Sequence, residues 1–466
     1  MLPNTLQFYL FLLISVSVYY TLPHRWRNCL LLAASIFFYA SWDWRFLGLL
    51  ALQIAVCYIL GLSIGKSTSQ NGRKWLLTTG MLLSLSLLVF FKYFNFLNDS
   101  ARQLCTALGL SYLVPHLSIL LPLGISFYTF QSLGYLVDVY RRQLEPERDF
   151  LRFSLFISFF PQIASGPIGR APELLPQFRT KREFSPEAFE AGLAQIIWGL
   201  FKKVVVADRL AFYVDAVYGN PAAYGSPSLC LAAFFFSIQI YCDFSGYTDI
   251  AIGTARLFGI ELRRNFDFPY FSTSINDFWR RWHISLTSWF RDYLYIPMGG
   301  NRCSRLRHAF NVMVVFLFSG LWHGANWTFL AWGGMHGILQ LLENVIRGRK
   351  PLPYRSWISK SVAGMFTFLM VTIAWIFFRS PDFSTASSVL KGIFYWQEGL
   401  SFGVSLNTFA INSLLLLVFA LWEAWNFIYP IQGKQPIWQR SLKYAVLLSM
   451  IAMFGQMSGG FIYQQF

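Results

Sequence analysis

Charged residues are scarce in this 466-residue chain, where they make up 13% of the sequence. Soluble domains average about 25% charged residues, so an ordinary soluble fold is excluded. Acidic residues are especially few: 22 Asp and Glu stand against 38 Lys and Arg, for a formal net charge of +16. The six cysteines show neither disulfide-type nor metal-type spacing, and we expect them to be small buried apolar residues.

Several catalytic motifs are also missing. The chain has no Gly-x-Ser-x-Gly nucleophile elbow, and it has no His-x3-His or Glu-x-x-His pair that would hold a metal ion. The segment closest to a phosphate-binding loop, residues 61–67, is one residue too short and ends an apolar run. We therefore expect no serine nucleophile, no metal and no resident cofactor.

Long apolar windows are abundant, because 55% of the residues are hydrophobic and 19% are aromatic. With re-entrant and amphipathic pieces added, these windows predict an all-α polytopic membrane protein with about eleven transmembrane helices. No room remains for a large soluble domain, so residues 1–466 are expected to form a single integral-membrane domain. The windows are residues 6–22, 29–42, 46–61, 76–91, 116–137, 229–259, 310–332, 361–378, 412–428 and 444–461.

Three zones of the sequence differ in composition. Residues 1–110 and 346–466 consist of plain hydrophobic spans, whereas residues 117–345 embed polar side chains among aromatics. The sequence contains no internal repeat, which argues mildly against the common transporter architectures. We expect the middle zone to contain the functional core.

The charge is arranged in loops that alternate between basic and nearly neutral. Under the positive-inside rule this pattern predicts a multi-pass membrane protein with its N-terminus outside. It also explains the positive charge without nucleic acid; binding of anionic membrane lipid is the alternative. The first apolar segment lacks a basic n-region and reads as a retained span. The basic loops are residues 24–27, 66–74, 141–148 and 347–360, and the neutral ones are 41–45 and 98–115.

Polar and helix-breaking residues interrupt the middle zone. Pro122 and Gly124 should disturb a helix there, and residues 159–170 contain two prolines and two glycines, which predicts irregular backbone buried in protein or lining water. Asp243 and Asp249 fall in an apolar stretch. We interpret these carboxylates as polar contacts between helices, with a place in a functional site as the alternative.

Histidines supply the strongest functional signal. Four of the six, His283, His308, His323 and His336, fall in one short stretch, and His323 lies inside an apolar run. An ionisable side chain at membrane depth is a functional candidate, and a neutral imidazole can accept a proton from a hydroxyl. Spacing alone leaves open that His323 is a satisfied structural residue.

The polar residues at 276–291 follow helical spacing, which predicts one amphipathic helix with an aromatic face beside its polar face. That helix is either an interfacial strut or the floor of a reaction chamber. We assign Trp282 mainly to packing. On one unbroken helix, His336 would lie roughly 20 Å from His323 and nearly opposite to it, so it is expected to be secondary. The polar positions are Asn276, Arg280, His283, Thr287 and Arg291.

Six stretches of the chain carry a family resemblance. The sequence resembles the membrane-bound O-acyltransferase family, in its bacterial branch of alginate O-acetyltransferases and teichoic-acid D-alanyl transferases, and is closer to the alginate type. The stretches are 122–141 (PLGISFYTFQSLGYLVDVYR), 159–170 (FFPQIASGPIGR), 239–250 (QIYCDFSGYTDI), 265–270 (NFDFPY), 274–302 (SINDFWRRWHISLTSWFRDYLYIPMGGNR) and 319–337 (SGLWHGANWTFLAWGGMHG).

The resemblance implies helices around a central funnel with two histidines at its constriction. It makes His323 the catalytic residue and His283 its companion, with residues nearby that position donor or substrate. The implied activity is transfer of an acetyl group from a cytoplasmic thioester such as acetyl-CoA to an exported polysaccharide, alginate-like or cellulose-like. The positioning candidates are Asn276, Arg280, Trp282, Trp322, Asn326 and His336.

The implied partners are membrane lipid, a polysaccharide synthesis complex and an extracellular or periplasmic acetyltransferase of the hydrolase type. Two alternatives remain open at this point. One is D-alanyl transfer to a cell-wall polymer, and the other is a proton-coupled transporter or flippase whose histidines relay protons.

Overall fold

Helices form all the regular structure in the residues that the computed structural model describes, which are 1–347, 356–399, 401, 404–429, 436–456 and 461. The predicted all-α membrane class is confirmed. The chain forms two compact units, Met1–Leu193 with Ala251–Arg263 and Ala194–Ile250 with Arg264–Phe466. The 117–345 zone is therefore shared between the units, and the single domain stays a prediction.

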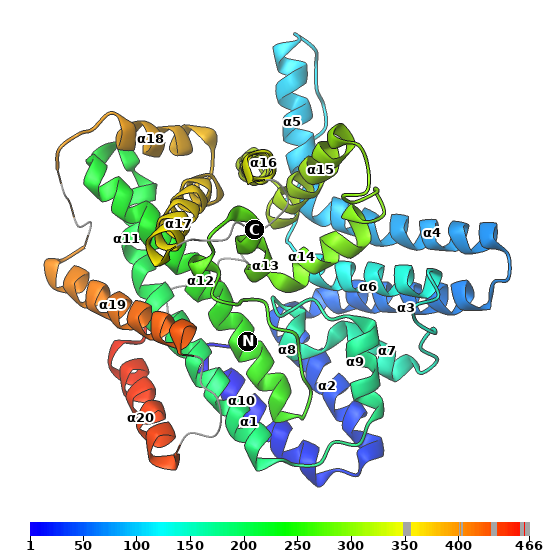
Figure 1. Cartoon of the computed structure of the whole chain (residues 1–466). Coiled ribbons are helices and arrows are strands. Elements are labelled where there is room, and N and C mark those ends of the chain that lie inside the picture. The colour runs from blue at the N-terminus through cyan, green and yellow to red at the C-terminus, as the bar shows by residue number, and fades with distance from the viewer. Residues whose placement is uncertain (348–355, 400, 402–403, 430–435, 457–460, 462–466) are drawn as a thin grey trace. The chain divides into compact units, whose positions relative to one another are not determined.

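Unit 1 contains the N-terminal helices (Figure 1). They are α1 (Leu6–Thr21), α2 (His24–Asp43), η1 (Trp44–Phe46), α3 (Leu47–Lys66), α4 (Gln70–Leu88), η2 (Val89–Tyr93), α5 (Phe94–Ala107), α6 (Ile125–Tyr140), α7 (Phe150–Ser158), α8 (Phe160–Ile163) and α9 (Ala171–Arg179). Two helices, α10 (Pro186–Leu200) and α12 (Ser226–Leu257), have residues in both units.

Unit 2 contains the remaining helices. They are η3 (Phe201–Ala207), α11 (Asp208–Gly219), η4 (Pro221–Ala223), η5 (Pro269–Phe271), α13 (Ile275–Arg281), α14 (Ile284–Phe290), η6 (Arg291–Tyr295), α15 (Arg305–His323), α16 (Trp327–Arg347), α17 (Trp357–Arg379), α18 (Phe383–Phe394), α19 (Leu406–Ile428) and α20 (Ile437–Phe454).

Five helical segments of the described residues are long and apolar enough to cross a membrane. Two of them, of 43 and 38 residues, are long for a single crossing of about 20 residues. The predicted number of about eleven crossings stays a prediction. The segments are His24–Lys66, Gln70–Ala107, Ser226–Leu257, Trp357–Arg379 and Leu406–Ile428.

Two predicted apolar windows are not continuous helices. In the 116–137 window, α6 begins only at Ile125, after a left-handed Gly124 (φ 68°). The segment before it is held by α5, where the Asn95 side chain both donates to and accepts from the backbone of Leu117. The 310–332 window is interrupted after His323, where α15 ends. The expected irregular backbone around residues 159–170 is present, because α8 spans only Phe160–Ile163.

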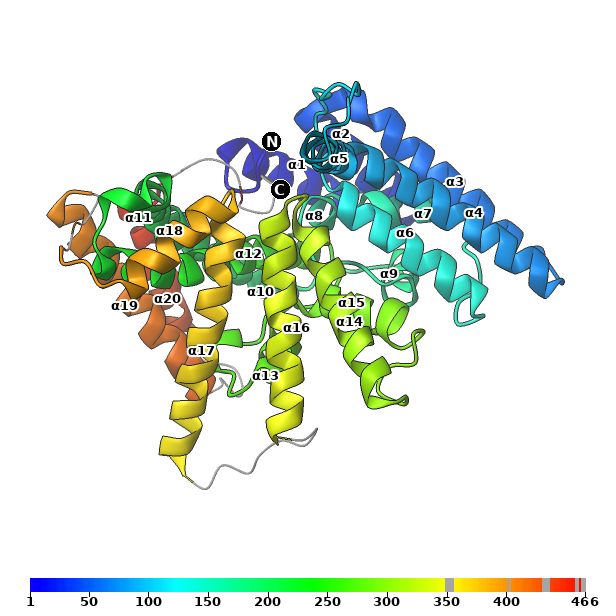
Figure 2. The same cartoon turned by 90° about the horizontal axis from the view of Figure 1, so that it is seen from above.

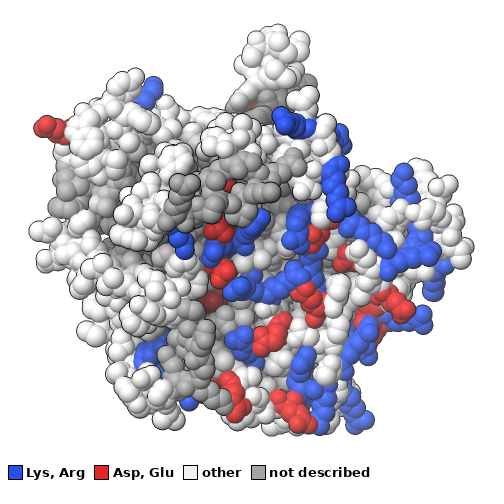
Figure 3. Space-filling model, in the orientation of Figure 1, with Lys and Arg blue, Asp and Glu red and all other residues white. Residues whose placement is uncertain are grey.

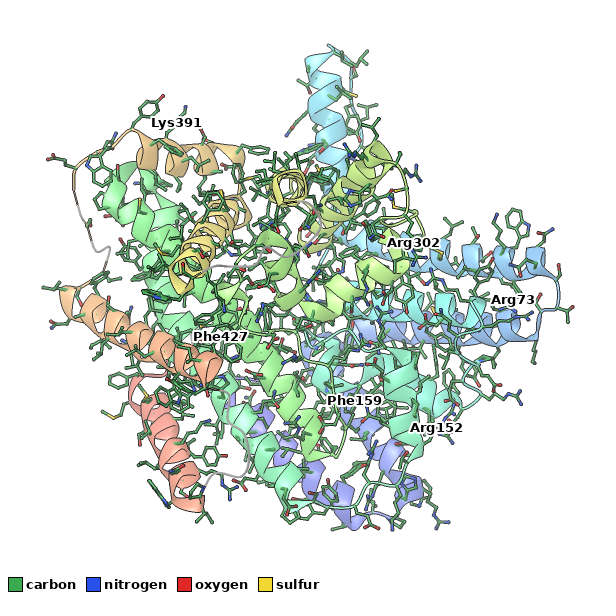
Figure 4. All side chains as sticks on the ribbon, in the orientation of Figure 1. Arg73, Arg152, Phe159, Arg302, Lys391 and Phe427 are labelled. Carbon is green, nitrogen blue, oxygen red and sulfur yellow. The ribbon has the colours of Figure 1, made fainter. Side chains whose placement is uncertain are left out.

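In unit 1, α3, α4 and α6 pack together, and two basic loops meet at one end of this bundle. Arg73, labelled in Figure 4, donates to the carbonyl oxygens of Val139 and Tyr140 at 3.1 and 2.5 Å. Figure 3 shows Lys and Arg side chains gathered over the part of unit 1 where α3 joins α4. The 66–74 and 141–148 loops thus share an end, as a common side of the membrane requires. Of the 347–360 loop, residues 348–355 lie outside the described residues.

A buried charge network joins η3 to its neighbours in unit 2. Lys203 pairs with Asp208 at 2.8 Å and with Asp243 at 2.5 Å, and Lys202 pairs with Asp249 at 2.5 Å. Buried charges need such partners because desolvation is costly. The interpretation of Asp243 and Asp249 as polar contacts between helices is confirmed. The two lysines were missed, although adjacent lysines inside an apolar run are a sequence signal.

Candidate functional site

The predicted helix over residues 276–291 is broken at its centre, so that prediction is wrong. Helix α13 ends at Arg281, α14 begins at Ile284, and His283 between them has a left-handed backbone (φ 45°, ψ 52°). A non-glycine residue in this region stores strain of about 1–3 kcal/mol and marks a candidate functional site. The break removes the continuous polar face, since residues before and after His283 no longer share one helical phase.

His323 is the last residue of α15, and the chain then turns through Gly324–Asn326 into α16. The two helices pack along their length, and Figure 2 shows α15, α16 and α17 side by side. Because of this turn, residues of α15 and α16 that would be far apart on one straight helix lie close together across a helical hairpin. His323 is 3% exposed, so it lies inside the unit and not on its surface.

The two histidines predicted to act together do converge. The rings of His283 and His323 have centroids 6.2 Å apart and planes inclined by 59°. Trp322 lies against both rings, 5.6 Å from that of His283 and 5.0 Å from that of His323. Phe244 of α12 closes on His283 at 4.7 Å, and Phe378 of α17 lies 5.4 Å from His323. The two imidazoles are therefore buried side by side among the same aromatic rings in unit 2.

His336 lies closer to His323 than the sequence predicted. Its ring is 5.1 Å from that of Trp332, which is 5.0 Å from the His323 ring, so one indole separates the two histidines. The expectation of opposite faces assumed an unbroken helix and is wrong for that reason. Trp279 donates its indole N–H to Nδ1 of His336 at 3.3 Å. In the neutral ring, the proton is then on Nε2.

Trp282 is fully buried in an aromatic stack beside the histidines. Its ring lies 5.0 Å from that of Phe266, 5.4 Å from that of Phe278 and 5.1 Å from that of Trp375. A packing role fits these surroundings. Elsewhere in unit 2, Phe271 and Phe427, the latter labelled in Figure 4, form a stacked pair with ring centroids 4.5 Å apart.

Three other residues that were predicted to position donor or substrate make their contacts elsewhere. Arg280 is exposed. Asn276 donates its backbone amide to the Glu343 carboxylate at 3.3 Å. Asn326 caps α16, since its side-chain oxygen accepts from Thr328 N–H at 3.1 Å, and its amide donates to the Pro381 carbonyl at 2.6 Å. Asn326 therefore holds the hairpin turn.

The electrostatics at His283 follow from burial. This residue lies outside the five candidate spans, and burial lowers the pKa of His283 to about 3. The ring is thus neutral at physiological pH and is a weak base. In the part of the chain that the structure covers, no group of three or more His, Cys, Asp or Glu side chains is arranged to hold a metal ion.

Buried imidazoles inside an all-helical, multi-span chain define an integral membrane protein with an ionisable site in its helical core. The chain belongs to the membrane-bound O-acyltransferase family, whose model matches residues 36–380 and so covers all four buried histidines. It is therefore an O-acyltransferase, and the resemblance noted from the sequence is confirmed.

Curated relatives match over most of the chain. The chain is 36% identical to the probable alginate O-acetylase AlgI of Pseudomonas putida, over 98% of each sequence. It is 40% identical to the probable alginate O-acetylase AlgI of Azotobacter vinelandii, over 84% of this chain and 77% of that protein. It is 36% identical to the peptidoglycan O-acetyltransferase of Helicobacter pylori, over 78% and 73%.

Proposed function

We propose that this protein transfers an acetyl group from a cytoplasmic thioester, acetyl-CoA or another carrier, toward the hydroxyl groups of an exported polysaccharide. The observation that carries the proposal is the convergence of His283 and His323, with ring centroids 6.2 Å apart among shared aromatic neighbours. The names of the relatives, alginate O-acetylase and peptidoglycan O-acetyltransferase, support an acetyl group and a polymer acceptor. An alginate-like or cellulose-like polymer fits the proposal.

In the proposed reaction, His323 accepts the proton of an acceptor hydroxyl while the oxygen of that hydroxyl attacks the thioester carbonyl carbon. The carbon–sulfur bond breaks, the ester forms, and the proton passes from His323 to the departing thiolate, so that atoms and charge balance. General-base assistance of this kind contributes about 10²–10⁴-fold to a rate. Gly320 and Gly324 near His323 let Phe329 pack closely, since a Cβ on the first would overlap its carbonyl oxygen and one on the second its ring.

His283 has a different proposed part. A ring whose pKa is about 3 accepts a proton poorly at neutral pH, but it remains neutral and can hydrogen-bond. We therefore assign orientation of the donor, or stabilisation of the oxyanion, to His283. Trp322 touches both rings and would shape the space between them. We assign no contact with the donor to Arg280, which is exposed.

The proposed setting is the bacterial cytoplasmic membrane, with the N-terminus outside. The acyl group would leave the histidine site toward the outer side of the membrane, where a hydrolase-like acetyltransferase partner or the polymer itself receives it. The alternation of basic and neutral loops supports this orientation. Membrane lipid and a polysaccharide synthesis complex are the other expected partners, and nucleic acid is not.

The test is transfer of label from acetyl-CoA in proteoliposomes, with the O-acetyl content of the exported polymer measured in cells. We expect label to move with the wild-type protein and not with His323→Ala at equal membrane abundance. Transfer from a D-alanyl carrier protein in place of acetyl-CoA would move the assignment to D-alanyl transfer. Proton-coupled flux without acyl transfer would show a transporter and overturn the proposal.

A further inference from the structure

The break at His283 is held by a segment that is distant in sequence, residues 265–267. The backbone amide of Asp267 donates to the Arg281 carbonyl at 3.0 Å, and the amide of Ile284 donates to the Asn265 carbonyl at 2.9 Å. These two bonds lie on either side of Trp282 and His283 and bracket them. The Arg281 guanidinium adds a third bond, to the Asp267 carbonyl at 3.2 Å.

Asn265 makes a further contact through its side chain. Its oxygen accepts from the backbone amide of Ser285 at 3.2 Å, so this one residue holds the first two amides of α14. Asn265 is fully buried, and its amide nitrogen lies 3.5 Å from the Thr248 hydroxyl of α12. The start of α14 is therefore tied to α12, the helix whose Phe244 packs on the His283 ring.

The residue after Asn265 completes the cradle. The Phe266 ring lies 5.0 Å from that of Trp282, edge to face, and 5.1 Å from that of Phe244. Phe244 lies 4.7 Å from His283. One short segment thus supplies hydrogen bonds to the residues on both sides of the break and one ring contact to Trp282 within it.

The local sequence opposes this break, because the polar residues from Asn276 to Arg291 follow one helical period. A continuous helix would place the His283 imidazole in another direction, and a left-handed backbone at a non-glycine residue is strained. Contacts from outside the helix must offset that cost. The hydrogen bonds from residues 265–267 are one such set of contacts, beside the Phe244 ring on His283 and the Trp375 ring on Trp282.

We propose that Asn265 is a positioning residue, which acts by fixing the left-handed turn of His283 so that its imidazole faces His323. This inference rests on the proposed function, because the effect is transmitted to acyl transfer through His283. The contact that carries it, and that Asn265→Ala removes, is the bond from the Ser285 amide to the Asn265 side-chain oxygen; the bond from Ile284 to the Asn265 backbone carbonyl is kept in every variant.

The experiment is a double-mutant cycle between Asn265 and His283, read as kcat and KM for acyl transfer from labelled acetyl-CoA. Asn265→Ala should lower kcat by about 10²-fold with little change in KM, since a shift of about 1 Å in a reacting group has effects of that size. Added to His283→Ala, it should cause no further loss. Asn265→Asp, which keeps an oxygen toward Ser285, should recover most of kcat.

Asn412 provides the matched control. It is also a buried asparagine of unit 2, and it exchanges two hydrogen bonds with Arg209, at 2.8 and 3.1 Å, without touching the His283 turn. Asn412→Ala should lower the thermal midpoint. In the double variant with His283→Ala, the fold-change in kcat should equal the product of the two single fold-changes. A structural role for Asn265 would give the same independent pattern.

Thr248→Val keeps the test decisive if Asn265→Ala does not fold. It removes only the anchor on α12, and we expect a few-fold lower kcat that disappears in the His283→Ala background. Unchanged kcat in folded Asn265→Ala, or independent losses in the cycle, would overturn the inference alone. Wild-type protein without acyl transfer, or active His323→Ala, would overturn the proposed function and the inference with it.

Discussion

Two helices of unit 2 break at a histidine, and they break in different ways. Between α13 and α14 the chain passes through a left-handed His283, whose geometry is held by residues 265–267. Between α15 and α16 the break follows His323 and uses Gly324, which has extended backbone (φ −159°, ψ 149°) and ends the helix without a left-handed residue. The first break is strained and held from outside; the second is built into its own sequence.

The second break is stabilised by close helix packing. A Cβ atom on Gly320 would overlap the carbonyl oxygen of Phe329, and one on Gly333 would overlap that of Phe316. Small residues that allow backbones to approach are a general device for packing helices in membranes. The comparison teaches that His323 is placed by the rigidity of a hairpin, whereas His283 is placed by contacts that can be removed one at a time.

The largest loss of acyl transfer is expected from substitution of His323. His323→Ala should lower acyl transfer by about 10²–10⁴-fold while the protein remains folded and in the membrane, because a general base is lost and the hairpin is not. The measurement is label transfer from acetyl-CoA at matched abundance. Normal acyl transfer by a well-expressed His323→Ala variant would show that His323 is not the general base.

The hairpin should be sensitive at its glycines. Gly320→Ala and Gly333→Ala place a Cβ on the backbone of the facing helix, so we expect a loss of stability at or above the upper end of about 1–3 kcal/mol. Gly334→Ala is the matched control, since its Cβ would meet nothing closer than a Leu317 methyl at 3.8 Å. Thermal midpoints in detergent would check this, and equal midpoints for all three variants would contradict close packing.

Much of this arrangement could be predicted from the sequence, and the exceptions have physical causes. The helical class, the paired carboxylates and the pair His283–His323 followed from apolar windows, the rarity of buried charge and family motifs. The break at His283 did not, because its cause lies in the contacts of Asn265 and Asp267, and tertiary contacts override a local helical period. A sequence signal for the second break existed, since Gly324 and the capping residue Asn326 are typical helix-end residues.

A smaller effect is expected at His336, beside the hairpin. His336→Phe leaves the Trp279 indole N–H without its acceptor, which should lower stability by about 1–2 kcal/mol, while Trp279→Phe added to it should restore part of the loss. Acyl transfer should fall less than in His323→Ala, since His336 is separated from His323 by Trp332. A loss of activity as large as that of His323→Ala would place His336 in the reaction.

The smallest expected effect is a pH dependence at the strained break. Burial lowers the folded-state pKa of His283 to about 3, from an unfolded value near about 6.5. Between these values the unfolded chain binds the proton and the folded chain does not, so stability rises with pH across this window and is fully present above about 6.5. From pH 6.5 down to 5.5 this single group should remove about 1 kcal/mol.

His283→Asn should abolish that contribution and keep the break, because asparagine tolerates the left-handed region. We therefore expect its free energy of unfolding to be flatter between pH 6.5 and 5.5 than that of the wild-type protein, by about 1 kcal/mol. His323→Ala, compared in the same way, should leave the helix break at His283 and its share of the acid slope unchanged. Identical slopes for wild type and His283→Asn would mean that His283 is not buried as a neutral ring. The strained break would then contribute no pH dependence to the free energy of unfolding.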